Sequence, residues 1–134
     1  MNLREEVGKR LPIPQGYKIL IAVPKFERTS KGGIVLPEET MKKEDMASVL
    51  GYVVKLGPAA YYGLDSNGQP KFPTGPYCKE GDWILMRSYS GTSFMVDSLK
   101  DAKLPNGLPL CHLRVINDDT VEAVVPNPEE VFKP

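Results

Sequence analysis

The chain has 134 residues, of which 41% are apolar and 25% are charged; this composition is typical of one globular domain and excludes a wholly disordered chain. Its 17 Lys and Arg balance its 17 Asp and Glu, so the sequence lacks the positive charge that nucleic-acid binding needs. The 12 glycines and 13 prolines argue against a helical bundle, since both residues break helices, and favour short strands joined by turns.

The N-terminal residues show no pattern of export or membrane insertion. Residues 1–10 are rich in charged side chains. The nearest apolar run, Ile19 to Val23, is too short for the apolar region of a signal peptide or for a membrane span. The two cysteines, Cys78 and Cys111, match neither a disulfide framework nor a zinc spacing. We therefore expect a cytoplasmic protein with reduced thiols, no metal site and no membrane contact.

Apolar runs between turn residues predict six strands in a single domain that spans residues 1–134. Residues 1–16 are polar and are interrupted by Pro12, Pro14 and Gly16. The predicted strands are residues 17–23, 49–56, 83–87, 89–96, 110–116 and 120–125, followed by a Pro-rich tail at 126–134. Such short strands favour an all-β fold in the form of a small β-barrel.

Two long connections separate these strands. Residues 25–48 carry many charges around an apolar island, Ile34 to Leu36, which lies between Gly32-Gly33 and Pro37. The glycines and charges indicate a solvated, mobile loop whose apolar island is suited to a groove on a partner. An ordinary edge or core strand is the alternative interpretation of that island. Residues 57–78 contain four glycines, four prolines and four aromatic residues, which predicts an extended hairpin that turns at 65–69.

Several segments resemble the GroES-like co-chaperonin family, and they follow the family's order. They are Lys31–Glu38, Gly51–Gly57, Lys79–Leu85 and Leu113–Val124. The resemblance covers roughly residues 14–125. The chain is longer than family members usually are, and most of its additional residues fall in 57–78, in 98–109 and in the two tails.

The resemblance implies a GroES-like β-barrel with a mobile loop at 25–48 and a roof hairpin at 57–78. It also implies a non-enzymatic co-chaperonin whose homo-heptameric ring caps a chaperonin and encloses a client polypeptide. ATP would bind the chaperonin, and this chain would bind no cofactor. The residues expected to contact the chaperonin are Gly32, Gly33, Ile34, Val35 and Leu36, and Tyr89 matches a family tyrosine near the enclosed chamber.

The family's ring is held by the first strand of one subunit and the last strand of its neighbour. In this chain those strands correspond to residues 17–23 and 120–125, and an unpaired strand edge invites such association. The residues expected at the subunit interface are Tyr17, Ile19, Ile21, Val121, Ala123 and Val125. The alternative is that the two strands pair within one chain, as in any closed barrel.

Two other function classes are alternatives to the co-chaperonin. The same barrel can be reused in a structural or assembly protein of a virus particle. A related barrel also occurs in zinc-dependent alcohol dehydrogenases, but this sequence lacks their metal spacing and their dinucleotide segment.

Two polar pairs are candidates for chemistry. In Cys111-His112, neighbouring strand residues should point to opposite faces, so we expect a buried cysteine beside a surface histidine and no catalytic pair. Asp118 and Asp119 follow Asn117 and indicate a turn before a strand, in preference to a metal site.

Overall fold

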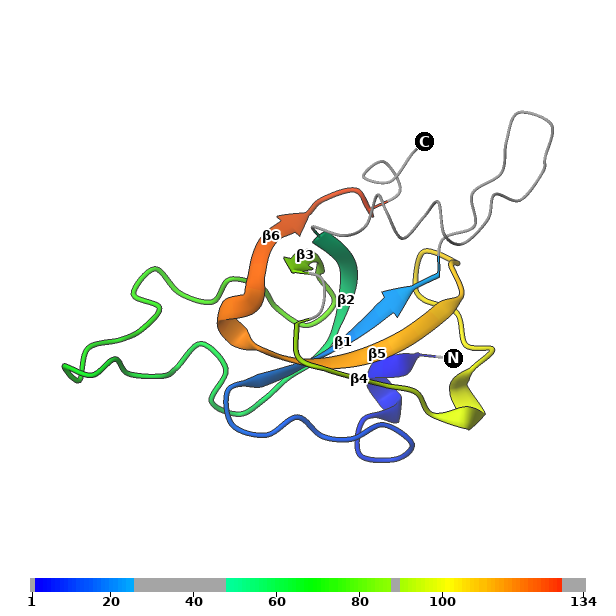
Figure 1. Cartoon of the computed structure of the whole chain (residues 1–134), viewed down its shortest axis with the longest axis horizontal. Helices are drawn as coiled ribbons and strands as arrows, with labels where there is room; N and C mark the ends of the chain where they lie inside the picture. Colours follow the sequence, from blue (N-terminus) through cyan, green and yellow to red (C-terminus); the bar gives the residue numbers. More distant parts are fainter. Residues whose placement is uncertain (1, 26–47, 88–89, 129–134) are drawn as a thin grey trace.

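The structure, a computed structural model, describes residues 2–25, 48–87 and 90–128. Six strands form one curled antiparallel sheet in the order β4-β5-β1-β2-β3-β6 (Figure 1). The strands are β1 (Lys18–Pro24), β2 (Ser48–Leu56), β3 (Trp83–Arg87), β4 (Thr92–Phe94), β5 (Leu110–Asn117) and β6 (Val121–Val125). Three short 3-10 helices complete the fold: η1 (Leu3–Glu6), η2 (Asp97–Leu99) and η3 (Asp118–Thr120). The all-β prediction is confirmed, and every predicted strand overlaps an observed one.

The edges of the sheet are β4 and β6, and no ladder among the described residues joins these two strands. The fourth predicted strand, residues 89–96, is shorter than expected, because only Thr92–Phe94 pairs with β5. Tyr89, which matches a family tyrosine near the enclosed chamber, lies outside the described residues.

The central strand β1 is buried on both faces. It pairs with β2 along one edge and with β5 along the other. Ile19 and Ile21 belong to one hydrophobic core, Leu20 and Ala22 belong to a second, and all four side chains are 0% exposed. Because successive side chains of a strand point to opposite faces, the two cores lie on opposite sides of the sheet.

The first core is covered by the segment between β2 and β3. Its members outside the strands are Ala60, Tyr61, Phe72 and Cys78. These residues pack against Val53 of β2, Ile84 and Met86 of β3 and Ile116 of β5. The predicted hairpin at 57–78 is therefore rooted in the core as well as extended into solvent, and Figure 1 shows it reaching away from the sheet.

The second core is covered by two segments without strands. The N-terminal segment contributes Leu3 and Leu11, and the segment before β5 contributes Leu99, Ala102 and Leu104. The sequence did not predict η1, which forms within residues 1–16 and packs on the sheet through Leu3. With Leu3 as its one apolar residue, this helix produces no periodic pattern in the sequence.

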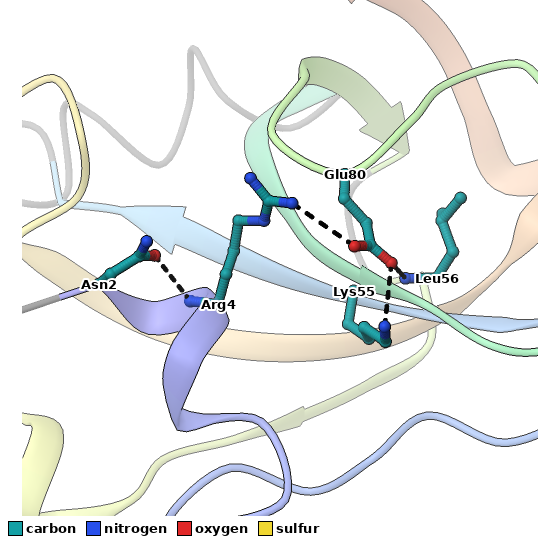
Figure 2. A network of polar contacts seen from close by, with 5 residues as sticks. All are labelled: Asn2, Arg4, Lys55, Leu56 and Glu80. Carbon is teal, nitrogen blue, oxygen red and sulfur yellow. Dashed lines mark hydrogen bonds and ion pairs between the residues drawn. The ribbon is translucent and has the colours of Figure 1, made fainter.

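A polar network around Glu80 orients η1 (Figure 2). Asn2 caps the helix, with its Oδ1 accepting a hydrogen bond from the Arg4 N–H at 3.0 Å. The Glu80 carboxylate lies 3.6 Å from Arg4 Nη2 and 3.4 Å from Lys55 Nζ, and it accepts a hydrogen bond from the Leu56 N–H. These ion pairs are partly exposed and contribute about 0–1 kcal/mol each, so apolar burial is the larger stabilising effect.

Candidate functional site

The predicted docking residues, Gly32 to Leu36, lie outside the described residues. The structure does place both ends of their segment, because β1 ends at Pro24 and β2 begins at Ser48. These strands are antiparallel neighbours, so a tight turn would suffice to join them. The long insertion therefore starts and ends on adjacent strands, and at its start the Lys25 N–H donates a hydrogen bond to the Pro109 carbonyl at 2.7 Å.

The hairpin at 57–78 and the segment 26–47 are attached to opposite ends of the β1–β2 pair. Near the first residue of β1, Gly57 donates its N–H to the carbonyl of Lys18 at 2.8 Å. The backbone passes so closely here that a Cβ on Gly57 would lie 2.5 Å from the Gly16 carbonyl oxygen. Since a seven-residue strand spans about 20 Å, this attachment point is separated from Pro24 by nearly the length of the sheet.

An aromatic cluster and a tight turn shape the hairpin at 57–78. The ring centroids of Tyr61 and Phe72 are 4.9 Å apart, and those of Phe72 and Tyr77 are also 4.9 Å apart, both in edge-to-face contact. At the tip, Asp65 Oδ1 accepts hydrogen bonds from the N–H groups of Asn67 and Gln69, which confirms the predicted turn.

Asp118 anchors this hairpin to the sheet. The Tyr61 N–H donates a hydrogen bond to Asp118 Oδ2 at 2.9 Å, and Asp118 is only 2% exposed. Tyr61 is the one described non-glycine residue with a positive φ, 67°, and this strained conformation persists because the surrounding contacts hold it. The turn at Asp118 is confirmed, but its first aspartate is also a buried acceptor, which sequence reasoning missed.

A hydroxyl and a thiol meet beside this anchor. The Tyr61 hydroxyl lies 3.4 Å from Cys78 Sγ inside the first core. Burial raises the pKa of the Tyr61 hydroxyl and the pKa of the Cys78 thiol, so both groups stay neutral at physiological pH. Neutral, buried groups of this kind indicate a structural role for Cys78.

The hairpin also presents apolar side chains to solvent. Tyr62 is 76% exposed and Leu64 is 66% exposed, although both lie within three residues of the buried Tyr61. Leu64 forms a bridge with Pro70 that draws the two arms of the hairpin together. Exposed apolar side chains on an ordered hairpin mark a candidate contact surface.

The residues predicted for the subunit interface fall into two groups. The exposed members are Tyr17 and Ala123, and the buried ones are Ile19, Ile21, Val121 and Val125. Both backbone edges of β1 are occupied within the chain, by β2 and β5, so β1 offers no free edge to a second copy. The two predicted interface strands, β1 and β6, do not pair with each other within the chain. Among the described strands, β6 pairs with β3 alone. Of the two strands predicted to form the interface, β6 is therefore the one with a free edge.

The expectation of a buried Cys111 and a surface His112 is wrong. Cys111 is exposed, His112 is partly buried, and His112 Nδ1 lies 3.4 Å from Cys111 Sγ. The reason is a β-bulge: Val23 of β1 faces His112, the next residue Pro24 faces Leu110, and Cys111 is the additional residue between them. A bulge interrupts the alternation of side chains, so two neighbouring residues can lie on the same side.

The hydrogen bonds of His112 define its tautomer. Its Nε2 accepts a hydrogen bond from Arg114 Nε at 2.9 Å, and an arginine nitrogen only donates. Nε2 is therefore unprotonated and the ring proton lies on Nδ1, which faces the Cys111 sulfur. Burial, and secondarily the charge of Arg114, lower the pKa of His112, so the ring is neutral at pH 7.

Other sites are not found in the described parts of the chain. In residues 2–25, 48–87 and 90–128 no three His, Cys, Asp or Glu side chains are grouped so as to hold a metal ion. Over the same residues, no helix has the length and hydrophobicity needed to cross a membrane.

Comparison with known proteins defines the class. The family model for the chaperonin 10 kDa subunit matches residues 12–103, which is more than half of the chain. This protein therefore belongs to the chaperonin 10 kDa subunit family, and the resemblance found in the sequence is confirmed.

Individual relatives agree with this assignment. A protein of Methylacidiphilum infernorum named co-chaperonin GroES is 31% identical over 84 residues, which are 63% of this chain and 75% of the relative. The protein of the same name from Staphylococcus carnosus is 32% identical over 83 residues, 62% of this chain and 78% of the relative. That of Chlamydia pneumoniae is 34% identical over 84 residues, 63% of this chain and 72% of the relative.

Replacing Asp118 with Ala is expected to lower the free energy of unfolding by about 1–3 kcal/mol, because it leaves the buried Tyr61 N–H without an acceptor. Asp118→Asn keeps an acceptor oxygen and should cost less. The adjacent Asp119→Ala is the matched control, since its ion pair with Lys71 is half exposed and contributes about 0–1 kcal/mol. Urea unfolding gives the energies, and limited proteolysis within 57–78 reports release of the hairpin; equal effects at both positions would contradict the anchor.

The single histidine is expected to titrate below its ordinary pKa of 6.5. Because the unfolded chain binds this proton more tightly, the contribution of His112 to the free energy of unfolding is complete above pH 6.5 and is lost as pH falls below it. Ring NMR shifts measured against pH, in buffer and in urea, give both midpoints directly. Arg114→Gln should raise the folded midpoint while leaving it below 6.5, and a folded midpoint at or above 6.5 would refute the assignment.

Proposed function

We propose that this chain is a co-chaperonin, in which a ring of copies caps a chaperonin and encloses a client polypeptide. The observation that carries the proposal is the match of residues 12–103 to the family model. The similarity to relatives named co-chaperonin GroES supports it. The chain itself performs no catalysis in this proposal, and ATP binds to the chaperonin.

The docking residues are Gly32 to Leu36. Burial of three apolar side chains contributes about 1.5–3 kcal/mol each. Ordering each residue of a loop costs about 1–2 kcal/mol, so a single loop binds weakly. Several loops on one ring raise one another's effective concentration, and a weak motif then suffices for docking. The attachment of residues 26–47 to adjacent strands supports this assignment, because all copies in a ring would carry the motif at the same end.

The ring contact is proposed to run through the edge of β6. On this strand Val124 is 46% exposed and the neighbouring Ala123 is also exposed. An apolar strand edge favours pairing with another copy, and a closed ring satisfies every such edge. The exposed Tyr17 is a further candidate for this contact, whereas Ile19 and Ile21 support it only by filling the core.

The hairpin at 57–78 is proposed as the roof of the ring. It is attached at the end of the β1–β2 pair that lies away from the docking segment. Its exposed Tyr62 and Leu64 are suited to contacts between neighbouring hairpins, which would cover them when the ring forms.

Replacing Val35 with Asp is expected to abolish binding to a chaperonin, because it places a charge in an apolar groove. The measurement is co-sedimentation of the chain with a chaperonin ring in the presence of ATP. The exposed Gln15→Asp adds the same charge outside the docking segment and should bind normally. Unchanged binding of Val35→Asp would refute the docking residues. Failure of the unmodified chain to bind, together with its presence in purified virus particles, would favour the structural alternative.

Replacing Val124 with Asp is expected to dissociate the ring, because it charges the exposed edge of β6. Light scattering and negative-stain electron microscopy measure the assembly state. Ile13→Asp is the matched control, since Ile13 is also an exposed apolar residue, 54% accessible, and lies in the N-terminal segment. Rings that persist in Val124→Asp, or that are lost equally in Ile13→Asp, would contradict a contact through β6.

A further inference from the structure

A basic cavity lies at the end of the sheet where β1 leads into the segment 26–47. Its volume is about 620 Å³, and it is lined by Lys25, Met95, Lys100, Asp101, Lys103, Pro109, Leu110 and Cys111. This volume falls within the range of about 300–1,000 Å³ that is usual for small-molecule sites. Three lysines and one aspartate are among the lining residues, and this excess of positive charge favours a ligand with negative charge.

Within the described part of the chain, these lysines form no ion pairs: none of Lys25, Lys100 and Lys103 has an acidic side chain within ion-pair distance. Ammonium groups gathered on the wall of a concave site focus a positive potential there and raise the local concentration of anions.

The same wall carries the one exposed thiol of the chain. Cys111 is exposed and Cys78 is buried, and the sequence has no further cysteine. The bulge in β5 places Cys111 at the cavity and brings His112 Nδ1 to 3.4 Å from the Cys111 sulfur. An N–H donor and nearby lysines both stabilise a thiolate, which is the reactive form of cysteine.

We propose that this cavity binds small anionic disulfides, of the class of glutathione disulfide, and that Cys111 forms a mixed disulfide with them. The lysines hold the carboxylates of the ligand, and the Nδ1–H of His112 supports the thiolate of Cys111. The proposal concerns a site that neither docking nor ring formation uses, and it stands independently of the co-chaperonin function.

The covalent step is a thiol–disulfide exchange. The Cys111 thiol gives its proton to solvent, and the thiolate attacks one sulfur of the ligand. A new bond forms from Cys111 Sγ to that sulfur while the S–S bond of the ligand breaks. The electron pair leaves on the second sulfur, which takes up a proton and departs as a free thiol. The cysteine is oxidised and half of the ligand is reduced, so no further oxidant is needed.

The test compares two disulfide reagents of opposite character on the full-length chain. Dithiobis(nitrobenzoate) carries two carboxylates, and dithiodipyridine is uncharged. At low ionic strength, Lys100→Gln/Lys103→Gln is expected to slow the reaction of Cys111 with the anionic reagent by about fivefold or more and with the neutral reagent by less than twofold. Lys71→Gln/Lys79→Gln removes two exposed lysines elsewhere and is expected to change neither rate.

A second measurement uses the proposed ligand class itself. Incubation with glutathione disulfide should add one glutathionyl group, which peptide mapping by mass spectrometry should place on Cys111. Cys111→Ser should remain unmodified. The proposal is overturned if the unmodified chain forms no adduct under native conditions, if the adduct lies on Cys78, or if the Lys100→Gln/Lys103→Gln variant reacts with both reagents as the unmodified chain does.

Discussion

The arrangement of the chain depends on the complete burial of β1. The side chains of β1 point into two cores, and both of its backbone edges are paired. Its burial therefore requires packing on both faces and a neighbouring strand on each edge. β2 and β5 supply the pairing. The hairpin after β2, together with β3, β5 and β6, encloses the first core. The N-terminal segment and the residues before β5 cover the second. The N-terminal segment and the additional residues in 57–78 and 98–109 therefore contribute to the core.

This organisation separates a rigid centre from the segments that are proposed to act. The β1–β2 pair has the proposed docking segment attached at one end and the aromatic hairpin at the other. Contacts with partners then depend on connections whose ends are fixed by buried strands, which is the usual division between scaffold and loops. The buried Asp118 extends the rigid part into the hairpin by fixing the backbone of Tyr61.

The largest disagreement between sequence reasoning and structure occurs on β5. Alternation predicts that Cys111 and His112 lie on opposite faces, and for a regular strand this prediction would hold. The bulge opposite Pro24 shifts the register by one residue and reverses both exposures. Nothing in the local sequence marks this bulge, because it is set by how β5 meets the end of β1. The same shift places a thiol in a basic cavity.

The sequence by itself determined the positions of the strands, the turn at the hairpin tip and the family, because these depend on local patterns of apolar and turn residues. The tertiary structure alone decided which strands are neighbours and that β6, not β1, has a free edge. It also decided that Leu3 belongs to a core and that a carboxylate after β5 holds the hairpin after β2. These features join residues far apart in the chain, and only the packing of the sheet brings such residues together.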